Sequence, residues 1–562
     1  MNFNLLLLNN ELADMPAPFG FENWLTFWMV IAVSVTNAIL MTFAGYKFLQ
    51  VVQLSSYKMR GYFGWIKDTK GAEWGRLVVL SFLSSAALLI TNVLLEDFFQ
   101  YKIMTYLGLV FYLIFCIVYI VNQYTRPQKT PLKYTQRMTR MVVVYALLVF
   151  VLSMVFLNVS FLYIPYFKYG AIGLTPMFIP LLVCLAYYIM LPFETLHNKS
   201  FIKKAKKKLN SYENLIKIGI TGSYAKTSVK NILASMLSEK YSVCCSPLSY
   251  NTPLGLSKTI LENLKKDDQI FIAEMGARYV GDISTLCEIV KPNIGIITGI
   301  GNQHLLTFGS KENLIKTKSE LTHFVESCGG KMFFNGDNEQ CRLMAESCIS
   351  EKVVSLPFEK NPVIYAEDIT YDKQGVNFTL VCGNKKLKTT ASLLGVHNVS
   401  NILLCANVCL SLGLTLEEIE ASIRKLVASP HRLALVPSSG SLIVIDDAYN
   451  GSVEGSKAAL NVLASYAGVT KVVITPGLVE LGIEQYESNK ELGRLIAKNA
   501  DYVIINGTTN YESLNDGLIA GGMANEKILR SGSLKQAVTL LQDITKPGDV
   551  VLFENDLPDN YN

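Results

Sequence analysis

Residues 215–230, LIKIGITGSYAKTSVK, carry the residue types of a phosphate-binding loop. A β-branched run at 216–220 predicts a buried strand, and a turn of small residues leads into Lys226 and Thr227 at the start of an apolar-periodic segment. There, backbone N–H groups at a helix N-terminus face phosphates, the lysine neutralises them and the hydroxyl binds magnesium. The strict pattern G-x-x-x-x-G-K-[ST] is not met, because isoleucine and Ala225 replace its glycines, so an ordinary strand-to-helix turn is the alternative.

Further candidates lie where parallel α/β sheets place their ligands, near the carboxyl ends of strands. Glu274 ends the run QIFIAE, and its carboxylate with the Thr227 hydroxyl would bind magnesium; an ordinary strand-end glutamate is the alternative. His304 follows another apolar run and two glycines, so it is either a metal ligand or a hydrogen-bonded loop residue. Lys318 falls on a predicted helix, where a lone lysine is normally exposed.

The elements that must position these residues alternate between strand and helix, which predicts an α/β fold with a parallel, doubly wound sheet. Residues 395–401 open a long apolar helix, where His397 or Asn398 either caps the helix or binds a ligand. Past Arg432 a smaller α/β unit of about 130 residues begins with the strand LIVIDDAYN.

The composition separates a membrane half from a soluble half. Of the 562 residues, 50% are hydrophobic and 17% are charged, and the apolar excess lies before residue 200. The net charge of +5 is small and the basic residues adjoin apolar segments, which favours anionic lipid over nucleic acid as their partner. Eleven cysteines without a C-x-x-C pair indicate reduced core residues of a cytoplasmic domain.

Five apolar runs of about 20 residues are long enough to cross a bilayer. They are residues 24–46, 77–95, 103–121, 141–163 and 171–191. The first begins too late for a signal peptide and lacks a cleavage site, so it is predicted to be an anchor.

Lysine and arginine gather at residues 47–76, at 123–140 and after the fifth run, which places these segments in the cytoplasm and the N-terminus outside. The basic stretch FIKKAKKKL is predicted to lie along the anionic inner leaflet, with a solvated linker as the alternative. The spans show no run of buried charges and no evident ion path, so a plain anchor and a lipid-recognising domain both stay open.

A series of motifs between residues 215 and 552 resembles the Mur ligase family, the ATP-dependent amide ligases of cell-wall peptide assembly, and most of all its D-alanyl-D-alanine-adding branch. The motifs are, in order, ITGSYAKTS, NTPLGLSKT, AEMGA, IGNQHLLTFGS, KTKSEL, NGDN, GVHNVSN, HR, IDDAYN, TPGLVELG and KPGDVVL. Each is weak alone, and the ordered set is very specific.

The apolar runs and the basic stretch predict a membrane domain of five helices at 1–198 and a basic connector at 199–212. The resemblance implies a central ATP-binding domain at 213–431 and a C-terminal Rossmann-like α/β domain at 432–562. The spans and the basic loops, together with the cell-wall role that the resemblance implies, predict a bacterial plasma membrane protein with both ligase domains in the cytoplasm.

The resemblance also implies roles for single residues. Catalysis would rest on Lys226, Glu274, His304 and Lys318. Two magnesium ions would be held by Thr227, Glu274, His304 and Lys318, the last of them carbamylated in many relatives. ATP would be bound by Gly222, Ser223, Lys226, Thr227, Ser228, Asn335, His397, Asn398, Asn401, Arg432, Asp447, Tyr449 and Asn450.

The implied reaction has two steps: a substrate carboxylate takes the γ-phosphate to form an acyl phosphate, and the amine of an amino acid or peptide then displaces phosphate. Three departures from the family pattern bear on it. Ala225 stands where the family usually has glycine, at a cost of about 1–2 kcal/mol if its φ is positive, so we expect weakened ATP binding. The family's lysine-glycine-serine-arginine turn does not follow the last strand, which leaves the amine donor open. Five spans stand where relatives carry a UDP-binding domain.

These departures favour an amide ligase whose acceptor is lipid-linked or part of a polysaccharide such as a capsule. One alternative is a peptidoglycan precursor ligase that adds D-alanyl-D-alanine to a UDP-muramyl tripeptide. Another is a catalytically weakened, membrane-tethered ATP-binding scaffold. A transporter with an attached ATPase fits least, because the spans are poor in polar residues.

Overall fold

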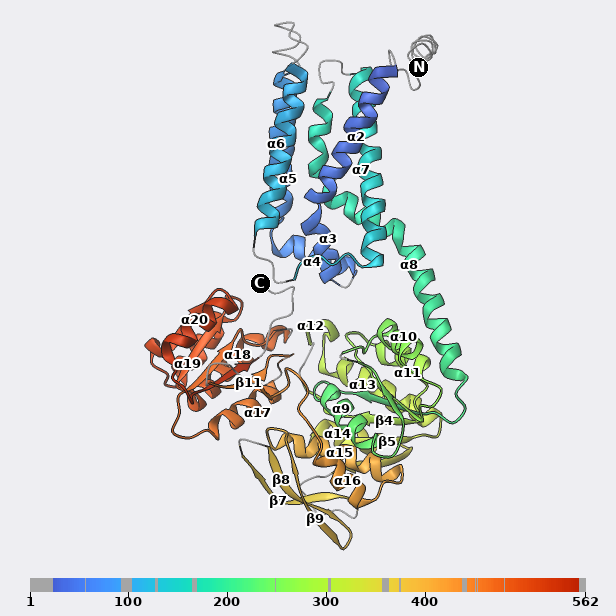
Figure 1. Cartoon of the computed structure of the whole chain (residues 1–562), viewed down its shortest axis with the longest axis vertical. Helices are drawn as coiled ribbons and strands as arrows, with labels where there is room; N and C mark the ends of the chain where they lie inside the picture. Colours follow the sequence, from blue (N-terminus) through green and yellow to red (C-terminus); the bar gives the residue numbers. More distant parts are fainter. Residues whose placement is uncertain are drawn as a thin grey trace, which may run out of the picture. The chain divides into compact units, whose positions relative to one another are not determined.

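A computed structural model gives the fold as two compact units, Met1–His197 and Asn198–Asn562 (Figure 1). The described residues are 24–55, 57–91, 104–126, 130–163, 169–247, 249–301, 305–355, 363–372, 375–436, 442–449, 451, 453–479 and 481–554.

The first unit is built of helices joined by turns and loops, with no strand among its described residues. Its helices are α2 (Trp24–Ala44), α3 (Tyr46–Leu54), α4 (Met59–Asp68), α5 (Ala72–Ile90), α6 (Met104–Thr125), α7 (Gln136–Tyr163), the 3-10 helix η4 (Gly170–Phe178) and α8 (Ile179–Asn210). Five helical segments are long and apolar enough to cross a membrane, at 27–44, 72–90, 107–125, 136–160 and 170–210. The five predicted runs are therefore confirmed as apolar helices, because a helix of about 20 apolar residues satisfies its own backbone polar groups.

The interior of this helical unit holds more polar side chains than the sequence indicated. Asn37 of α2 donates to Ser153 Oγ on α7 at 2.8 Å and to Thr175 Oγ1 in η4 at 3.1 Å, and Tyr112 of α6 donates to its amide oxygen. All four side chains are buried. The expectation of polar-poor spans is wrong at this point, because single polar residues on different helices converge here and satisfy one another.

Helix α8 runs unbroken for 32 residues, so the basic stretch expected as a connector is the last part of this helix (Figure 1). The residues of α8 from Asn198 onward belong to the second unit, and there Ala205 and Leu209 are buried in one of its cores. Lys208 Nζ donates to the backbone oxygens of Leu261 at 3.1 Å and Leu264 at 2.8 Å. This end of α8 is therefore packed on protein, which fits neither a solvated linker nor a helix lying only on lipid.

The second unit begins with a six-stranded parallel sheet of order β2-β3-β1-β4-β5-β6. Its strands are β1 (Ile216–Thr221), β2 (Val243–Cys245), β3 (Ile270–Glu274), β4 (Ile294–Ile297), β5 (Lys331–Asn335) and β6 (Glu351–Ser355). The helices that follow them are α9 (Lys226–Leu237), α10 (Pro253–Glu262), α11 (Asp282–Val290), α12 (Leu305–Phe308), α13 (Lys311–Ser327) and α14 (Glu339–Ser347).

Both faces of this central sheet are covered, as the apolar strands require. One core joins the sheet to α9 and to α15 (His397–Ser411) and α16 (Leu416–Ile423), while the other joins it to α10, α11, α13 and α14. The doubly wound parallel sheet is thus confirmed. The sequence reading missed an antiparallel sheet made of β7 (Tyr365–Tyr371), β8 (Val376–Cys382) and β9 (Lys385–Ala391).

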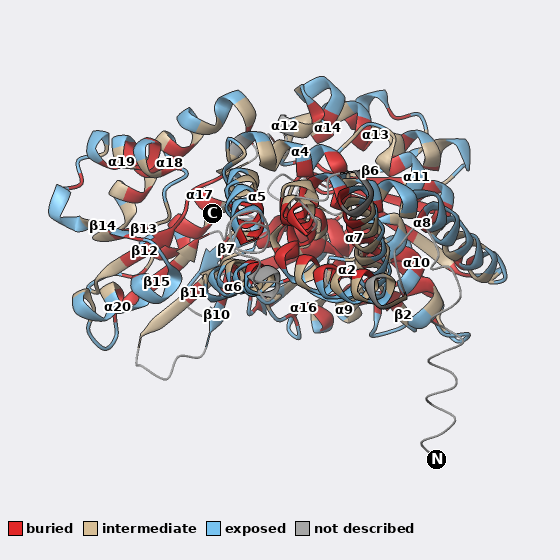
Figure 2. Cartoon of the chain, turned by 90° about the horizontal axis from the view of Figure 1, so that it is seen from above, coloured by how far each residue is buried: buried red, intermediate tan, exposed pale blue. Residues whose placement is uncertain are grey.

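The C-terminal domain is built on a mixed sheet of order β10-β11-β15-β12-β13-β14, in which only the pairing of β10 with β11 is antiparallel. Its strands are β10 (Ala434–Val436), β11 (Ile443–Asp447), β12 (Lys471–Thr475), β13 (Tyr502–Asn506), β14 (Ile528–Ser531) and β15 (Val550–Glu554). Its helices are α17 (Val453–Ala464), η5 (Gly482–Glu484), α18 (Gln485–Asn499), α19 (Tyr511–Ala520), η6 (Asn525–Lys527) and α20 (Leu534–Ile544). Figure 2 shows β12, β13 and β15 largely buried, with α18, α19 and α20 exposing their outer faces.

Candidate nucleotide and magnesium site

The predicted phosphate loop connects β1 to α9. Gly222 must be glycine, because a Cβ there would lie 2.1 Å from Thr298 Oγ1. Ser223 N donates to Gly299 O at 2.7 Å, which ties the loop to the end of β4. Ala225 precedes α9 with φ of 61°, the left-handed conformation that an alanine adopts only at a cost of about 1–2 kcal/mol. The loop therefore keeps its turn, with strain stored at Ala225.

Lys226 begins α9 and folds back over this loop. Its Nζ donates to the backbone oxygens of Gly222 at 2.8 Å and Ser223 at 2.9 Å. Desolvation, with the Arg432 guanidinium adding to it and Glu274 opposing it, lowers the pKa of Lys226 to about 8. An anion bound at the helix N-terminus would favour the ammonium form again, because opposite charges stabilise each other.

Glu274, at the end of β3, is the centre of a buried polar cluster. Its Oε2 accepts from Thr227 Oγ1 at 2.9 Å and lies 3.2 Å from Lys230 Nζ. Its Oε1 accepts from Asn251 Nδ2 at 3.1 Å. The predicted neighbourhood of Thr227 and Glu274 is present, because the parallel register pairs Ile220 of β1 with Glu274 of β3.

Lys318 lies on α13 and is buried, not exposed as a lone helical lysine normally is. Burial, with Lys226 as a second and smaller influence, lowers the pKa of Lys318 well below its usual range. Burial therefore makes the uncharged amine easier to form than at an exposed lysine, and the uncharged amine is the form that reacts as a nucleophile.

Asn335 ends β5 and joins the sheet to α15. Its Nδ2 donates to Thr298 O at 2.9 Å, and its Oδ1 accepts from Ser400 Oγ at 3.1 Å. Asn401 donates to Asn398 Oδ1 at 3.2 Å, and both asparagines are buried. The capping expectation for this helix is wrong: Val396 is the N-cap residue and no side chain caps it. His397 is the first helical residue and is exposed.

Arg432 brings the beginning of the C-terminal domain to the phosphate loop. Its Nη2 donates to Thr227 Oγ1 at 3.1 Å, and its guanidinium carbon lies 4.6 Å from the centre of the Tyr449 ring. Asp447 accepts from Leu433 N at 2.9 Å, which fixes the chain directly after Arg432. The predicted residues Arg432, Asp447 and Tyr449 therefore lie at one end of this domain.

A second carboxylate, which the sequence reading did not single out, adjoins Asp447. Glu554 ends β15 and stands opposite Asp447 in the parallel register with β11. Its buried oxygens accept from Ser456 Oγ and from Thr475 Oγ1, the latter at 2.8 Å. Burial, together with Glu554, raises the pKa of Asp447 to about 8.

The predicted residues on the phosphate loop and at the ends of β3, β5 and β11 converge in space, and Lys226 is close enough to Lys318 to help lower its pKa. His304 and Asn450 lie outside the described residues. Sequence reasoning missed Lys230, although its place four residues after Lys226 on one helix puts both lysines on one face. It also missed Asn251, which opens the quoted motif NTPLGLSKT.

The donor set of Thr227 and Glu274 fits magnesium, which prefers hard oxygen ligands and phosphate. In the described part of the chain, no three side chains of histidine, cysteine, aspartate or glutamate gather into a metal cluster. A cation held by one hydroxyl and one carboxylate would complete its coordination with water and phosphate oxygens, as magnesium commonly does.

Comparison with known proteins identifies two family domains. The Mur ligase middle domain matches residues 220–409, and the Mur ligase glutamate ligase domain matches residues 431–554. The UDP-N-acetylmuramoyl-tripeptide–D-alanyl-D-alanine ligase of Mycobacterium bovis is 30% identical over 360 residues, covering 60% of this chain and 69% of the relative. The ligase of the same name from Bacillus subtilis is 27% identical over 343 residues, covering 60% and 72%.

A solved structure gives the same picture. The MurF ligase of Thermotoga maritima, in complex with ADP, has 25% sequence identity and a TM-score of 0.57, and the match covers 65% of this chain and 81% of that one.

Proposed function

Because the chain belongs to the Mur ligase family, we propose that it joins D-alanyl-D-alanine to the terminal carboxylate of a UDP-muramyl tripeptide. Members of this family are ATP-dependent ligases that form amide bonds, and the activity named for the relatives supports this acceptor and donor over a polysaccharide acceptor. The observation that carries the proposal is the contact chain from Arg432 through Thr227 to Glu274, which joins the two ligase domains at the phosphate loop.

In this proposal the triphosphate lies at the N-terminus of α9, where backbone N–H groups and Lys226 neutralise it. Thr227 and Glu274 would hold magnesium, which supplies further positive charge to the phosphate oxygens. We add Gly222, Ser223, Ser228, Asn335, His397, Asn398, Asn401, Asp447, Tyr449 and Asn450 to the nucleotide site, and we retain His304 as a ligand of a second magnesium ion.

The chemistry begins when an acceptor carboxylate oxygen attacks the γ-phosphorus. The bond from the γ-phosphorus to its bridging oxygen breaks, ADP leaves and an acyl phosphate remains. The uncharged donor amine then attacks the acyl carbon, and the tetrahedral intermediate expels inorganic phosphate and loses its proton. The chain contributes positive charge from Lys226 and Arg432 and the exclusion of water, because an acyl phosphate hydrolyses readily.

Lys318 has a separate role in this proposal. Burial lowers the pKa of its amine well below the usual range, and the uncharged amine can add to carbon dioxide, with loss of a proton, to form a carbamate. The carbamate is an anionic oxygen ligand, which suits a second magnesium site.

The five long apolar helices favour a second candidate function, ligation at the membrane surface. We propose that the first unit spans a plasma membrane, with both ligase domains, at 213–431 and 432–562, in the cytoplasm. In this candidate function the acceptor is the same muramyl peptide carried on a lipid. The capsule-type polysaccharide expected from the sequence is a further alternative acceptor.

The test is phosphate release from Mg-ATP by the full chain in detergent, with D-alanyl-D-alanine and bicarbonate present. One arm supplies UDP-muramyl tripeptide and the other a matched lipid-linked muramyl tripeptide, beside a Lys318→Ala control. Release that requires donor and UDP-linked acceptor supports the main proposal, and release with the lipid-linked acceptor alone supports the second candidate. ATP binding without release in either arm would leave the scaffold function.

A further inference from the structure

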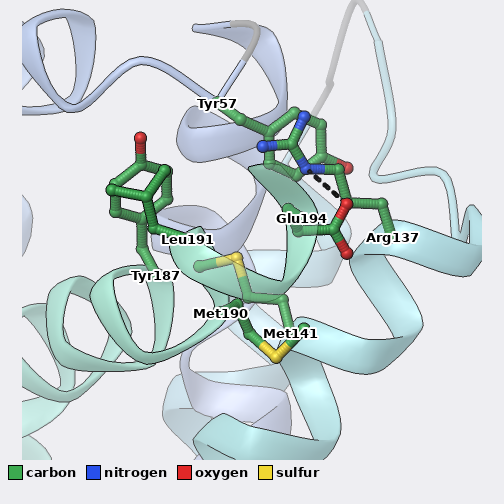
Figure 3. Close-up of a pocket in the computed structure, with 7 residues that line it drawn as sticks. All are labelled: Tyr57, Arg137, Met141, Tyr187, Met190, Leu191 and Glu194. Carbon is green, nitrogen blue, oxygen red and sulfur yellow. Dashed lines mark ion pairs between the residues drawn. The ribbon is translucent and has the colours of Figure 1, made fainter. Parts of the chain in front are cut away.

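The helical unit contains a pocket that the ligase reaction does not use. Its lining residues come from three elements, the turn after α3, the start of α7 and the last apolar turns of α8 (Figure 3). They are Tyr57, Arg137, Met141, Tyr187, Met190, Leu191 and Glu194. One side of the pocket is charged and the other is formed by methionine, leucine and tyrosine.

Two arginines face the one buried carboxylate of this pocket, but they are used differently. Arg140 donates to Glu194 Oε1 from Nε at 2.9 Å and from Nη2 at 2.6 Å. Arg137 Nε lies 3.6 Å from Glu194 Oε2, which is too long for a hydrogen bond. Its guanidinium carbon lies 3.9 Å from the centre of the Tyr57 ring. Arg137 is thus oriented by stacking and charge, with its N–H donors making no hydrogen bond to the residues described.

The charges around this guanidinium select an anion. Arg137 and Arg140 together carry two positive charges against the one negative charge of Glu194, so the cluster is formally cationic. A planar guanidinium with free donors matches the paired oxygens of a phosphate. A neutral polar ligand would gain no such charge-assisted bonds.

The apolar wall favours an amphiphile over a small free anion. Met141, Met190 and Leu191 continue the pocket along α7 and α8, and Leu191 is itself exposed. An amphiphile would place its charged end on Arg137 and its chain along these side chains.

We propose that this pocket binds the phosphate headgroup of a membrane lipid, with Arg137 as the phosphate ligand and Tyr57 as the residue that positions it. Basic pockets between helices at the cytoplasmic side of a membrane hold anionic headgroups in this way. The proposal rests on the proposed membrane insertion of the helical unit and is independent of the ligase reaction. Two sources share this chemistry: an ordinary anionic phospholipid, and a polyprenyl phosphate of the kind that carries envelope precursors.

The experiment titrates the full chain in neutral detergent with dioleoyl phosphatidic acid and measures bound lipid by native mass spectrometry. Dioleoylglycerol is the phosphate-free probe and farnesyl phosphate is the polyprenyl probe. We expect Arg137→Gln to weaken phosphatidic acid binding about tenfold, the usual worth of a charge-assisted hydrogen bond. Arg60→Gln, which removes the same charge from the exposed face of α4, is the matched control and should bind as the wild type does.

Further variants separate the two halves of the pocket. Tyr57→Phe should keep the stacking and the binding, while Tyr57→Ala should lose much of both. Met190→Trp should fill the apolar side and weaken lipid binding with both arginines intact. Size-exclusion profiles and unfolding midpoints identify any variant that fails to fold.

Preference for farnesyl phosphate supports a polyprenyl carrier, and preference for phosphatidic acid supports a phospholipid. Three results would each overturn the proposal. Dioleoylglycerol could bind as tightly as phosphatidic acid, or Arg137→Gln could bind phosphatidic acid as tightly as the wild type does. Inorganic phosphate could also displace the bound lipid as effectively as phosphatidic acid does. Alkaline carbonate extraction of cell membranes tests membrane insertion separately. Phosphate release by Arg137→Gln should match that of the wild type, so a failure of the ligase function is seen independently of lipid binding.

Discussion

Lys230 Nζ lies 3.2 Å from Glu274 Oε2, and both side chains are almost completely buried beneath the phosphate loop. Lys230 is one turn after Lys226 on α9, so one helix presents two cations in different roles. Lys226 bonds to the loop carbonyls, whereas Lys230 neutralises the carboxylate that also accepts from Thr227. We interpret Lys230 as the residue that balances the charge of Glu274 and holds its carboxylate in place for the metal.

The first prediction concerns this ion pair. Lys230→Met should destabilise the protein by about 3–5 kcal/mol, because it leaves a buried carboxylate without its counter-charge. Lys240→Met, which removes a partly exposed lysine paired with Glu418 at 3.8 Å, should cost less than about 1 kcal/mol. Denaturant unfolding followed by intrinsic fluorescence measures both. The double variant Lys230→Met/Glu274→Gln should recover part of the loss, and no recovery would contradict the pairing.

The second prediction concerns the backbone strain at Ala225, whose φ is 61°. Ala225→Gly should stabilise the chain by about 1 kcal/mol and strengthen ATP binding, because glycine adopts this conformation without a Cβ penalty. Ala234→Gly in the interior of the same helix is the control and should destabilise by about 0.5–1 kcal/mol. Unfolding midpoints and ATP titration provide the two readouts. Weaker ATP binding by Ala225→Gly would show that the methyl group does not limit this loop.

The local pattern was sufficient for much of the fold and of this site. Apolar runs separated by turns predicted the five long helices and the parallel sheet, and strand-end positions predicted that Thr227 and Glu274 would meet. The burial of Lys318 could not be read from sequence, because it depends on which face of α13 packs on the sheet. The contact between Arg137 and Tyr57 joins residues 80 positions apart, beyond the reach of periodicity. The sheet β7-β8-β9 was missed because its outer strand β9, KKLKTTA, is polar and mostly exposed.

The third prediction is a pH dependence that comes from Asp447. Its pKa is raised to about 8, so the native chain holds a proton that the unfolded chain releases above pH 4. This contribution to stability is complete below the unfolded pKa and is lost as the pH rises toward 8, by at most about 1.4 kcal/mol per pH unit. Asp447→Asn, which keeps an oxygen for Leu433 N, should lower the slope of unfolding midpoint against pH between 5.5 and 7.5. An unchanged slope would place the titration on another group.

The fourth prediction concerns the buried amine of Lys318. Lys318→Ala should abolish ligation, and removing bicarbonate from the wild type should lower its activity, because the carbamate depends on dissolved carbon dioxide. Lys316→Ala, on the exposed side of the same helix, should retain activity. A carbamate signal by carbon-13 NMR after labelling with bicarbonate checks the modification directly. Full activity in carbon-dioxide-free buffer would argue against it.

The last prediction concerns the link between the two ligase domains. Arg432 donates to Thr227 Oγ1 at 3.1 Å while its guanidinium stacks on Tyr449. Arg432→Lys keeps the positive charge but loses the planar stack and the reach of Nη2, so the KM for ATP should rise about tenfold. Tyr449→Phe retains an aromatic face and should change the KM for ATP little. Tyr449→Ala removes the stacking partner of Arg432 and should raise the KM for ATP, as Arg432→Lys does. Steady-state kinetics at saturating acceptor gives these values. Since a purely structural arginine would lower the unfolding midpoint without raising KM, a variant with normal KM and reduced stability would assign Arg432 to folding and remove it from the nucleotide site.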